Sequence, residues 1–479
     1  MRSRGTAICL AAGAGHRFGG GKLLAHFDGR PILQHVLDAL AAAGIPDPVV
    51  VLGVHGDALE GGLDWRDADR IRNPDPRRGL ASSLQAGWEA AMARNPHPGR
   101  VLVVLGDQPR IAPATIAALL AEPDDPARPV VVARHPDGSR NPVRLEPAAA
   151  SLVAMAAGDR GLGPILDVHP ELVRTIDVAA PNPDVDRRAD LVRLVEDRWA
   201  ERVGENAAQV ERVREAPDGR DFYATVSRTF VADPARAGDP VLAALEGIAQ
   251  PGDTWLDIGA GAGRYALPLA RRVREVIAID PSASMLAALR AGSASHEIHN
   301  IRVLEDRWPP GAASRAQLGP DPVADVALMA HVGYDIAAIG PFIDAMERAS
   351  RRTCVAVLRE QSPASVAAPF WPAVHGVERV PLPALEAFVE LISARGAVVR
   401  VERVAGEHRR WVDRDELVRF LRRQLWTAPG SAADERLLAA VDRLAATRSD
   451  GGLTVPSAPD LEVGVVTWTP VAGEAPRGQ

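Results

Sequence analysis

Cysteine is scarce in this chain, with only two among 479 residues. Cys9 and Cys354 both lie in short apolar runs typical of buried strands, which argues against a disulfide framework and for a reducing, cytoplasmic compartment. Long apolar runs are also missing, so we expect neither a membrane-spanning helix nor a signal peptide. The net charge of −7 provides no general attraction to nucleic acid or anionic membranes, and we expect neither as a partner.

The composition is that of a globular protein, with 47% apolar and 24% charged residues. Strand-like apolar runs alternate with helix-like segments in both halves of the chain, which predicts two three-layer α/β domains with mostly parallel sheets. The expected strands are residues 7–10, 49–52, 101–105 and 130–133 in the first half, and 254–258, 276–279, 325–329 and 354–358 in the second.

A polar, charged stretch at residues 190–215 is followed by the turn signal APDG at residues 216–219. The domain boundary is expected there. We expect a first domain over residues 1–195, a linker over 196–221 and a second domain over 222–479.

The first glycine loop, LAAGAGHRFGGGKLL at residues 10–24, follows the first expected strand. Glycines such as Gly13 and Gly15 let the backbone approach a polyphosphate closely. Arg17 and Lys22 can neutralise charge on a triphosphate and on the departing pyrophosphate. The alternative interpretation is a flexible loop with two solvated cations.

Two further motifs strengthen the nucleotide interpretation. In NPDPRRGLASSLQAG, residues 73–87, Gly79 and Ser83 form a small-residue turn before a helix, which suits a nucleotide at a helix N-terminus. In VLVVLGDQP, Asp107 follows an apolar strand, where a carboxylate can bind Mg²⁺ beside phosphates. A carboxylate that only caps a helix is the alternative for Asp107.

In this order and spacing the motifs resemble the molybdenum cofactor cytidylyltransferases, within the wider family of molybdopterin and sugar-phosphate nucleotidyltransferases. The matching patterns are LAAGxxxRxGxxKxL, GxxxSLxxG and GDxP, followed by SRNPVRL, GDRGLGPIL and DVDRRADL at residues 139–145, 158–166 and 184–191. The chain departs from the family at Gln108, where methionine is common, and at Arg187 and Arg188, where Thr-Pro is usual. The resemblance implies a nucleotide-diphospho-sugar-transferase-like, Rossmann-like fold.

The resemblance also implies an activity: transfer of CMP from CTP to a molybdopterin-type acceptor, with release of pyrophosphate. It implies Mg²⁺ at Asp107 and Asp186, charge stabilisation by Arg17 and Lys22, and a molybdoenzyme or its chaperone as a further partner. The LAAG sequence is the version associated with CTP over GTP. The nucleotide-binding residues implied in this way are Leu10, Ala11, Ala12, Gly13, Gly15, Lys22, Gly79 and Ser83. Transfer to another phosphorylated acceptor stays open as an alternative.

The second glycine loop, DIGAGAG at residues 257–263, also lies between a strand and a helix. Asp280 ends the next strand, where a carboxylate can bind both hydroxyls of a ribose. Dinucleotide-binding folds share this pattern, so NAD stays open. The acidic Asp257 at the start of the loop, and VLEDRWPP at residues 303–310 after a third strand, favour S-adenosylmethionine (SAM).

Together these features resemble the class I SAM-dependent methyltransferases, which implies a Rossmann-like second domain. By this resemblance Gly259, Gly261 and Gly263 border the methionine and ribose, Asp280 binds the ribose, and Glu305 or Asp306 lies by the adenine. His331, Tyr334 and Asp335 lie where acceptor contacts often occur in such folds, although a polar strand end and helix cap explain them equally well. The alternatives are a SAM-binding regulatory module without transfer activity and, third, an oxidoreductase.

An arginine-rich stretch at residues 403–423 contains interleaved acidic residues and an apolar stripe. The stripe predicts an amphipathic helix, with Asp413 and Glu416 forming its N-terminal cap. A basic binding patch is the alternative.

Overall fold

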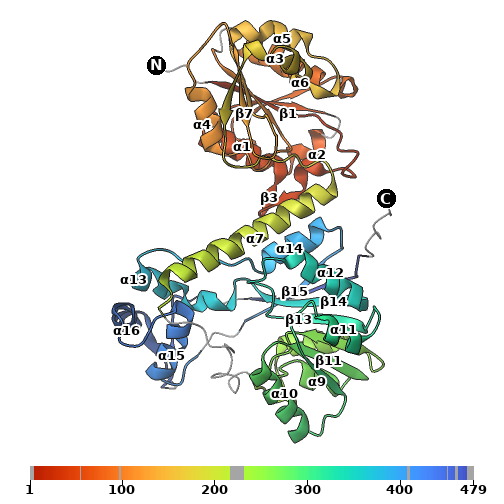
Figure 1. Ribbon diagram of the computed structural model, residues 1–479, viewed down its shortest axis with the longest axis vertical. Helices are drawn as coiled ribbons and strands as arrows, with labels where there is room; N and C mark the ends of the chain where they lie inside the picture. Colours follow the sequence, from red (N-terminus) through yellow and green to blue (C-terminus); the bar gives the residue numbers. More distant parts are fainter. Residues whose placement is uncertain are drawn as a thin grey trace. The chain divides into compact units, whose positions relative to one another are not determined.

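The computed structural model divides the chain into two compact units, Met1–Leu194 and Val195–Gln479, here called the first and second units (Figure 1). Among the described residues, no helix is both long and apolar enough to cross a membrane. The structure describes residues 5–53, 56–95, 99–215, 231–406, 410–449, 451–458 and 462–471.

The first unit is built around a seven-stranded sheet of order β5-β4-β1-β6-β8-β7-β9. Its strands are β1 (Thr6–Ala11), β4 (Val49–Leu52), β5 (Asp69–Arg72), β6 (Val101–Leu105), β7 (Val130–Arg134), β8 (Val143–Leu145) and β9 (Val173–Asp177). Only β8 runs antiparallel to its neighbours, β6 and β7. The central strands β1 and β4 are almost wholly buried and apolar, as expected for a parallel sheet covered on both faces.

Helices cover both faces of this sheet. Ile8 and Leu10 of β1 share a hydrophobic cluster with Ala81 and Leu84 of α3, whereas α1 contacts α4. The predicted mostly parallel, three-layer α/β fold is therefore confirmed. The helices are α1 (Ile32–Ala42), α2 (Gly56–Glu60), α3 (Leu80–Arg94), α4 (Pro113–Ala121), α5 (Ala150–Met155) and α6 (Gly163–Val168); β2 (His26–Phe27) and β3 (Arg30–Pro31) form a small separate sheet.

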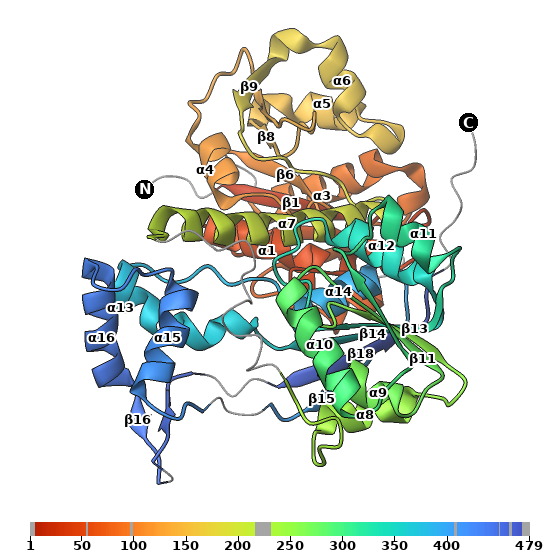
Figure 2. The same ribbon diagram turned by 60° about the horizontal axis from the view of Figure 1, so that its bottom comes forward.

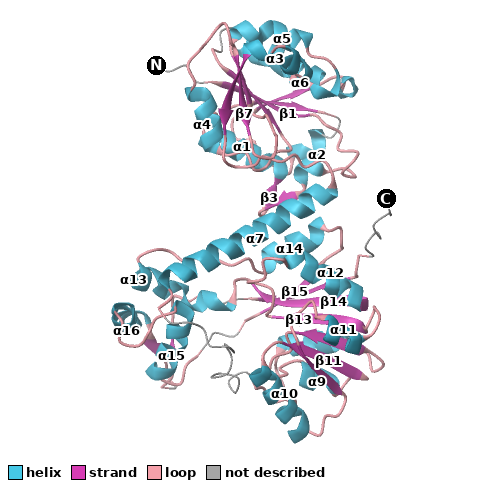
Figure 3. Cartoon of the chain, viewed as in Figure 1, coloured by secondary structure: helices cyan, strands magenta, loops and turns pink. Residues whose placement is uncertain are grey.

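The second unit contains its own seven-stranded sheet, of order β12-β11-β10-β13-β14-β18-β15 (Figure 3). Strand β18 is antiparallel to β14 and β15, and the pairs from β12 to β14 are parallel. The second α/β fold is therefore confirmed as well. The strands are β10 (Thr254–Ile258), β11 (Glu275–Asp280), β12 (Ile301–Glu305), β13 (Ala324–Ala330), β14 (Ser350–Arg359), β15 (Arg400–Val404) and β18 (Val463–Trp468).

One face of the second sheet packs against α8, α9 and α10 through residues such as Leu245, Leu269 and Leu286. Helices α12 and α14 contact other parts of the sheet, including β13, β14 and β18. The helices of the unit are α8 (Pro240–Ile248), α9 (Ala266–Ala270), α10 (Ala283–Ser295), α11 (Ala312–Leu318), α12 (Ile339–Ala349), α13 (Trp371–His375), α14 (Leu385–Ala394), α15 (Arg414–Leu425) and α16 (Ala432–Leu444).

A second hydrophobic cluster lies apart from the sheet, where α13, α15 and α16 gather (Figure 2). Trp371, Leu421 and Leu437 are fully buried in it. The amphipathic helix predicted from the arginine-rich stretch is α15, and the Asp413 side chain accepts a hydrogen bond from the Glu416 backbone N–H at 2.7 Å. The predicted cap is therefore confirmed. The two-residue strands β16 (Ala446–Thr447) and β17 (Leu453–Thr454) pair antiparallel.

Helix α7 (Arg188–Val213) occupies much of the expected linker. Its Trp199 Nε1 donates to Ile336 O at 3.0 Å, and its Gln209 Nε2 donates to Glu378 O at 2.7 Å, so the part of this helix after Leu194 packs within the second unit. The expected linker end and domain start, residues 221 and 222, lie outside the described residues.

Candidate functional sites

The first glycine loop follows β1 and ends in the short helix η1 (Lys22–Leu24). Gly19, Gly20 and Gly21 have φ values of 93°, 94° and 65°. No described atom lies within 4 Å of the place where their side chains would begin, so backbone conformation rather than lack of space requires these glycines. Gly20 N donates to Gly15 O at 3.2 Å, which closes the loop before Lys22.

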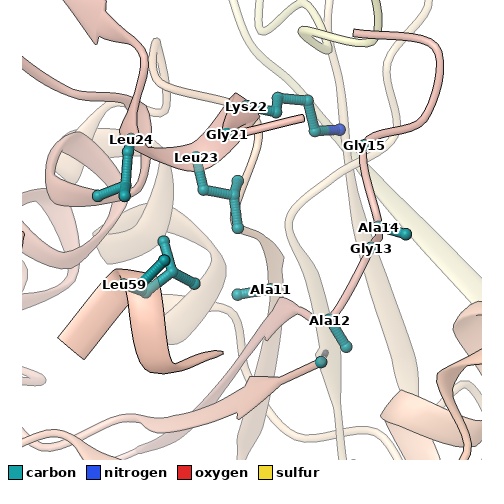
Figure 4. A pocket seen from close by; sticks show the side chains of 12 residues that line it. Ala11, Ala12, Gly13, Ala14, Gly15, Gly21, Lys22, Leu23, Leu24 and Leu59 are labelled. Atoms are coloured by element: carbon teal, nitrogen blue, oxygen red, sulfur yellow. The ribbon is translucent and has the colours of Figure 1, made fainter. Parts of the chain in front are cut away.

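A pocket lies between this loop and α2. Figure 4 shows the Leu23 and Leu59 side chains on its apolar side and the backbone of Gly13 and Gly15, with Lys22 Nζ, on the other. One wall thus suits a base or ribose, and the other suits phosphates. The lining residues are Ala11, Ala12, Gly13, Ala14, Gly15, Gly21, Lys22, Leu23, Leu24, Gly53, Ala58 and Leu59.

Two cations and two carboxylates form one ion-pair network beside this pocket. Lys22 Nζ lies 2.6 Å from Asp107 Oδ2 and 3.6 Å from Asp186 Oδ1. Arg17 Nη2 lies 2.9 Å from Asp186 Oδ2. The Lys22 side chain is only 10% exposed, against 64% for Arg17, so the Lys22 pair is the less screened by water. The structure therefore brings together four residues from three separate segments of the chain.

Asp184 is a third carboxylate of this network that the sequence interpretation did not select. The residue as a whole is exposed, yet partial burial of its carboxyl group and the charges of Asp107 and Asp186 raise its pKa to about 6. Val185 N donates to Asp107 O at 3.0 Å, which joins this segment to the end of β6. Crowded carboxylates of this kind favour binding of a cation.

The start of α7 holds Asp186 in place despite the two arginines that depart from the family pattern. Asp190, the third residue of α7, accepts hydrogen bonds through Oδ2 from Asp186 N at 3.0 Å and Arg187 N at 2.7 Å, and so caps the helix from within its first turn. The Arg188 guanidinium lies 5.5 Å from the Phe18 ring centroid, within cation–π range. The unusual pair therefore leaves the Asp186 carboxylate free to meet Lys22 and Arg17.

The second motif of the first unit forms a tight turn before α3. Gly79 has a φ of 90°, and a side chain there would begin 2.5 Å from the backbone carbon of Gly158. Ser83 is buried, and its hydroxyl accepts a hydrogen bond from Asn73 Nδ2 at 2.9 Å. These residues order the turn, and neither Gly79 nor Ser83 lines the pocket described above. Leu10 is likewise buried in the core, where its carbonyl accepts from Gly106 N at 2.9 Å.

The second glycine loop follows β10 and lies against the end of β11. Asp280 Oδ2 accepts a hydrogen bond from Gly261 N at 2.9 Å, and Asp280 Oδ1 accepts from Ser282 N at 2.8 Å. Gly259 and Gly263 have φ values of 74° and 85°. These bonds hold the loop and orient the Asp280 carboxylate, which can accept further bonds from hydroxyl groups.

Asp257 is buried, with 2% of its surface exposed, and its side chain has no hydrogen-bond partner among the described residues. Burial raises its pKa to about 7, and the charge of Asp280 adds to the increase. A buried carboxylate without a partner is costly unless a positive group reaches it. This arrangement fits the positively charged methionine end of SAM.

Glu305 and Asp306 end the next strand. Glu305 is exposed and pairs with Asp280 in the β11–β12 register. Asp306 instead faces its own turn, because its carboxylate accepts hydrogen bonds from Arg307 N and Gly311 N, both at 2.8 Å. Hydrogen bonds from Ser314 and from these backbone groups lower the pKa of Asp306.

The comparisons with known proteins agree with this division of the chain. Residues 7–174 match the family model described as the MobA-like NTP transferase domain. Nicotine blue oxidoreductase of Paenarthrobacter nicotinovorans is 32% identical over 203 residues, which cover 40% of this chain and 96% of that protein. Through its first unit, the chain belongs to the MobA-like NTP transferase family.

Two further similarities concern parts of the chain. The bifunctional protein GlmU of Heliobacterium modesticaldum is 35% identical over 119 residues, and the match spans only 24% of each protein. The crystal structure of Rv0371c from Mycobacterium tuberculosis H37Rv is 28% identical and covers 41% of this chain and 100% of that chain, with a TM-score of 0.36.

Residues 256–335 match the family model described as a methyltransferase domain. This match begins within β10 and includes the second glycine loop, Asp280 and the end of β13. The second unit therefore contains a methyltransferase domain, which implies SAM as the methyl donor.

One residue of the NTP transferase site, Asp184, escaped the sequence interpretation, and one further signal for the predicted Lys22 was not used. The sequence shows Asp184 only as the first acidic residue of DVDRRADL, and it gives no sign of the burial that shifts its pKa. The signal for Lys22 is present in the sequence itself, because Lys22 is the single lysine among the 55 lysine and arginine residues of the chain. A lone lysine at the phosphate-facing wall of a pocket points to a role that arginine does not fill.

Proposed function

We propose that this protein is a bifunctional enzyme. Its NTP transferase unit would transfer CMP from CTP to a molybdopterin-type acceptor, and its methyltransferase unit would transfer a methyl group from SAM to a second acceptor. The first proposal rests chiefly on one observation: the ammonium group of Lys22, whose side chain is 10% exposed, lies between Asp107 and Asp186 beside a glycine-walled pocket.

In the proposed nucleotidyl transfer, a terminal phosphate oxygen of the acceptor forms a bond to the α-phosphorus of CTP. The bond from that phosphorus to the bridging oxygen breaks, and pyrophosphate leaves. The nucleophile is already an anion, so the protein needs no general base, and positioning and charge neutralisation supply the catalysis. Lys22 and Arg17 would stabilise the charge that develops on the transferred phosphoryl group.

Asp107 and Asp186 would hold Mg²⁺, with Asp184 as a third carboxylate close to both. Among the described residues, no group of three His, Cys, Asp or Glu side chains is arranged to hold a metal by itself. This fits Mg²⁺, which usually keeps several waters and binds through one or two carboxylates plus substrate phosphates. The raised pKa of Asp184 also fits, because a cation there would relieve the repulsion among the carboxylates.

The pocket suggests where the nucleotide would lie. The phosphates would meet the backbone of Gly13 and Gly15, and the ribose or base would meet the apolar wall of Leu23 and Leu59. Preference for CTP rests on the LAAG sequence at residues 10–13 and on the resemblance that it carries. Gly79 and Ser83 would shape the site indirectly, through the turn that they order.

In the methyltransferase unit, Asp257 would face the ammonium group of SAM and Asp280 would accept from the ribose hydroxyls. Gly259, Gly261 and Gly263 would border the methionine and ribose, and Glu305, at the edge of β12, would lie nearer the adenine than Asp306 does. The methyl group is already activated on the sulfonium, so these residues mainly bind and orient it.

Two alternatives have specific support. The resemblance of the first-unit motifs to sugar-phosphate nucleotidyltransferases favours transfer to another phosphorylated acceptor, with the second unit then binding SAM as a regulator. The name of nicotine blue oxidoreductase favours a redox reaction in the first unit. The ion-pair network argues against the redox alternative, because hydride transfer has no need of clustered carboxylates beside a lysine.

The deciding experiment measures pyrophosphate release by the full chain with Mg²⁺ and either molybdopterin or its molybdenum-loaded form, comparing CTP, GTP and ATP. We expect release with CTP in preference to the others. Release only with a sugar phosphate would favour the first alternative, and NADPH oxidation without pyrophosphate release would favour the second. Formation of S-adenosylhomocysteine (SAH) on addition of an acceptor separates a methyltransferase from a SAM-binding regulator.

A further inference from the structure

The end of β13 places a strained histidine beside the second glycine loop. His331 has a φ of 58°, a conformation that residues other than glycine adopt rarely. The residue after it packs on the loop: a side chain at Gly259 would begin 2.4 Å from Val332 Cγ2. Such strain persists only where surrounding structure enforces it, and it often marks a functional position.

The His331 ring has an unused acceptor or donor. Its Nδ1 is buried and has no hydrogen-bond partner among the described residues. Its backbone N–H donates to Val357 O at 2.8 Å, which fixes the residue at the end of the sheet. Buried polar atoms in folded proteins almost always have partners, so a missing one marks a place for a ligand or water.

Arg359 lies on the neighbouring strand at the same sheet edge. It is the last residue of β14, two positions beyond the Val357 that binds His331, and its backbone N–H donates to Tyr334 Oη at 2.7 Å. Its side chain is partly exposed, and its guanidinium has no hydrogen-bond or ion-pair partner among the residues that the structure describes. It is thus available to an anion.

The other charged groups near His331 are already engaged. Arg264, next to the glycine loop, lies 3.2 Å from Asp239, the N-cap of α8, and Arg236 lies 3.0 Å from the same carboxylate. Burial lowers the pKa of His331 to about 3, and the positive charges of Arg359 and Arg264 add to the decrease, against the opposing effect of Asp239. The imidazole is therefore neutral near neutral pH and can accept a hydrogen bond.

Topology places these two residues beside the proposed SAM site. The carboxyl ends of β10, β11, β13 and β14 lie at one edge of the sheet because these strands are parallel. Ligands of open α/β sheets bind outside that edge. The donor residues Asp257 and Asp280 belong to β10 and β11, which leaves the ends of β13 and β14 for the acceptor.

We propose that His331 and Arg359 bind the methyl acceptor, and that this acceptor is a small molecule with an anionic group and a hydroxyl or amine. Arg359 binds the anionic group, and His331 Nδ1 accepts a hydrogen bond from the hydroxyl or amine. This inference rests on the proposed methyl transfer by the second unit, and it adds the chemical class of the acceptor.

The test uses the full chain saturated with SAH and measures binding of simple probes by calorimetry. The probes are the ortho, meta and para hydroxybenzoates, benzoate, and the matching hydroxybenzamides, which lack the negative charge. Binding of SAH itself is measured first. Failure to bind SAH would remove the proposed methyltransferase function, whereas SAH binding without hydroxybenzoate binding would overturn this inference alone.

We expect at least one hydroxybenzoate to bind about tenfold or more tightly than its amide, a difference of about 1.4 kcal/mol. In Arg359→Gln this acid-over-amide preference should vanish, while Arg400→Gln, at an exposed position of β15, should keep it. In His331→Asn the hydroxybenzoate should bind no better than benzoate. Asparagine tolerates positive φ, so this variant should still bind SAH, which checks that it folds.

Three results would each contradict the inference. The first is equal binding of hydroxybenzoates and their amides, and the second is an acid preference that survives Arg359→Gln. The third is a hydroxyl preference that survives His331→Asn. Each of these would assign the acceptor to other residues of the second unit.

Discussion

The two glycine loops of this protein carry opposite electrostatic environments. In the NTP transferase unit, carboxylates are paired with cations: Lys22 bridges Asp107 and Asp186, and Arg17 joins Asp186. In the methyltransferase unit, Asp257 is buried without a hydrogen-bond partner among the described residues and lies near a second carboxylate, Asp280. The two loops look alike in sequence. Their surroundings differ, because the carboxylates near the first loop are paired with cations and those near the second are not.

This difference follows from the ligands that we propose for each loop. A nucleoside triphosphate with Mg²⁺ brings both strong negative charge and a cation, so its site contains both signs before the ligand binds. SAM brings a sulfonium and an ammonium group, so its site can leave carboxylates uncompensated. The charge around a glycine loop is thus more informative about its ligand than the glycines themselves.

The largest effect should come from Lys22→Met, which removes the positive charge from the network in the NTP transferase unit. We expect pyrophosphate release to fall by at least about 100-fold, comparable to the loss of one preorganised transition-state donor. SAM binding by the other unit should not change. Retained nucleotidyl transfer would show that the lysine only neutralises Asp107 and Asp186.

The single lysine allows a second measurement on the unmodified protein. An amine-specific reagent can label only Lys22 and a free α-amino group, because the chain has no other lysine. CTP with Mg²⁺ should protect Lys22 from labelling, as judged by mass spectrometry of the peptide that contains it. SAM should give no protection, and protection by SAM would contradict the separation of the two sites.

A smaller effect is expected from Gly259→Ala in the methyltransferase unit. The new side chain would begin 2.4 Å from Val332 Cγ2 at a φ of 74°, so SAM should bind about tenfold or more weakly, the equivalent of about 1.4 kcal/mol. Gly319→Ala is the matched control. It has a φ of 85°, but no described atom lies within 4 Å of the place where its side chain would begin, and it lies outside the proposed SAM site. Equal losses in both variants would assign the effect to backbone strain alone.

The elements of both sheets could be predicted from the sequence because buried parallel strands give short, continuous apolar runs. The strand before Asp107 and the strand before the first glycine loop are of this kind. Helix α7 was harder to predict. Its polar Asn206 and Gln209 are buried through hydrogen bonds to the Val380 and Glu378 carbonyls, which composition does not reveal.

Other parts of the sites depend on contacts between distant segments. The pKa of Asp184 is raised because the segment after β9 returns to the end of β6, a proximity that sequence spacing does not encode. The hydrophobic cluster of α13, α15 and α16 is similar, because its residues Trp371 and Leu437 come from separate helices. The cap of α15 could be predicted because Asp413 and Glu416 act within one turn.

The raised pKa of Asp257 should give SAM binding a pH dependence that CTP binding by the other unit does not share. Its folded pKa, about 7, lies above the ordinary value of 3.8. Its protonated form therefore stabilises the folded unit below the ordinary value, and this stability is lost as the pH rises through about 7. A bound ammonium group favours the ionised form, so SAM should bind more tightly above about pH 7 than below it.

Calorimetry in buffers of different ionisation enthalpy checks this, since SAM binding near pH 6 should release a proton from Asp257. Asp257→Asn should bind SAM more weakly and without that proton release. CTP binding by the NTP transferase unit should keep its own pH dependence in the same variant. Unchanged proton release in Asp257→Asn would assign the titration to another group.

The smallest effect should come from removing one helix cap in each unit. Asp190→Ala removes the acceptor that Asp186 N and Arg187 N use at the start of α7, and Asp413→Ala removes the cap of α15. Each should lower the free energy of unfolding by about 1 kcal/mol, the usual value of a lost cap. Denaturant titration measures both losses.

Only Asp190 lies next to a proposed catalytic carboxylate, that of Asp186. Comparing Asp190→Ala with Asp413→Ala therefore separates an effect on that carboxylate from an effect on stability. Asp190→Ala should also slow pyrophosphate release several-fold. The backbone N–H of Asp186 loses its hydrogen bond to Asp190, so the Asp186 carboxylate should spend less time in contact with Lys22. Asp413→Ala should leave that rate unchanged at the same loss of stability. If both variants slow pyrophosphate release equally, the rate follows overall stability and the position of Asp186 does not depend on Asp190. If only Asp190→Ala slows the release, the position of Asp186 limits the reaction.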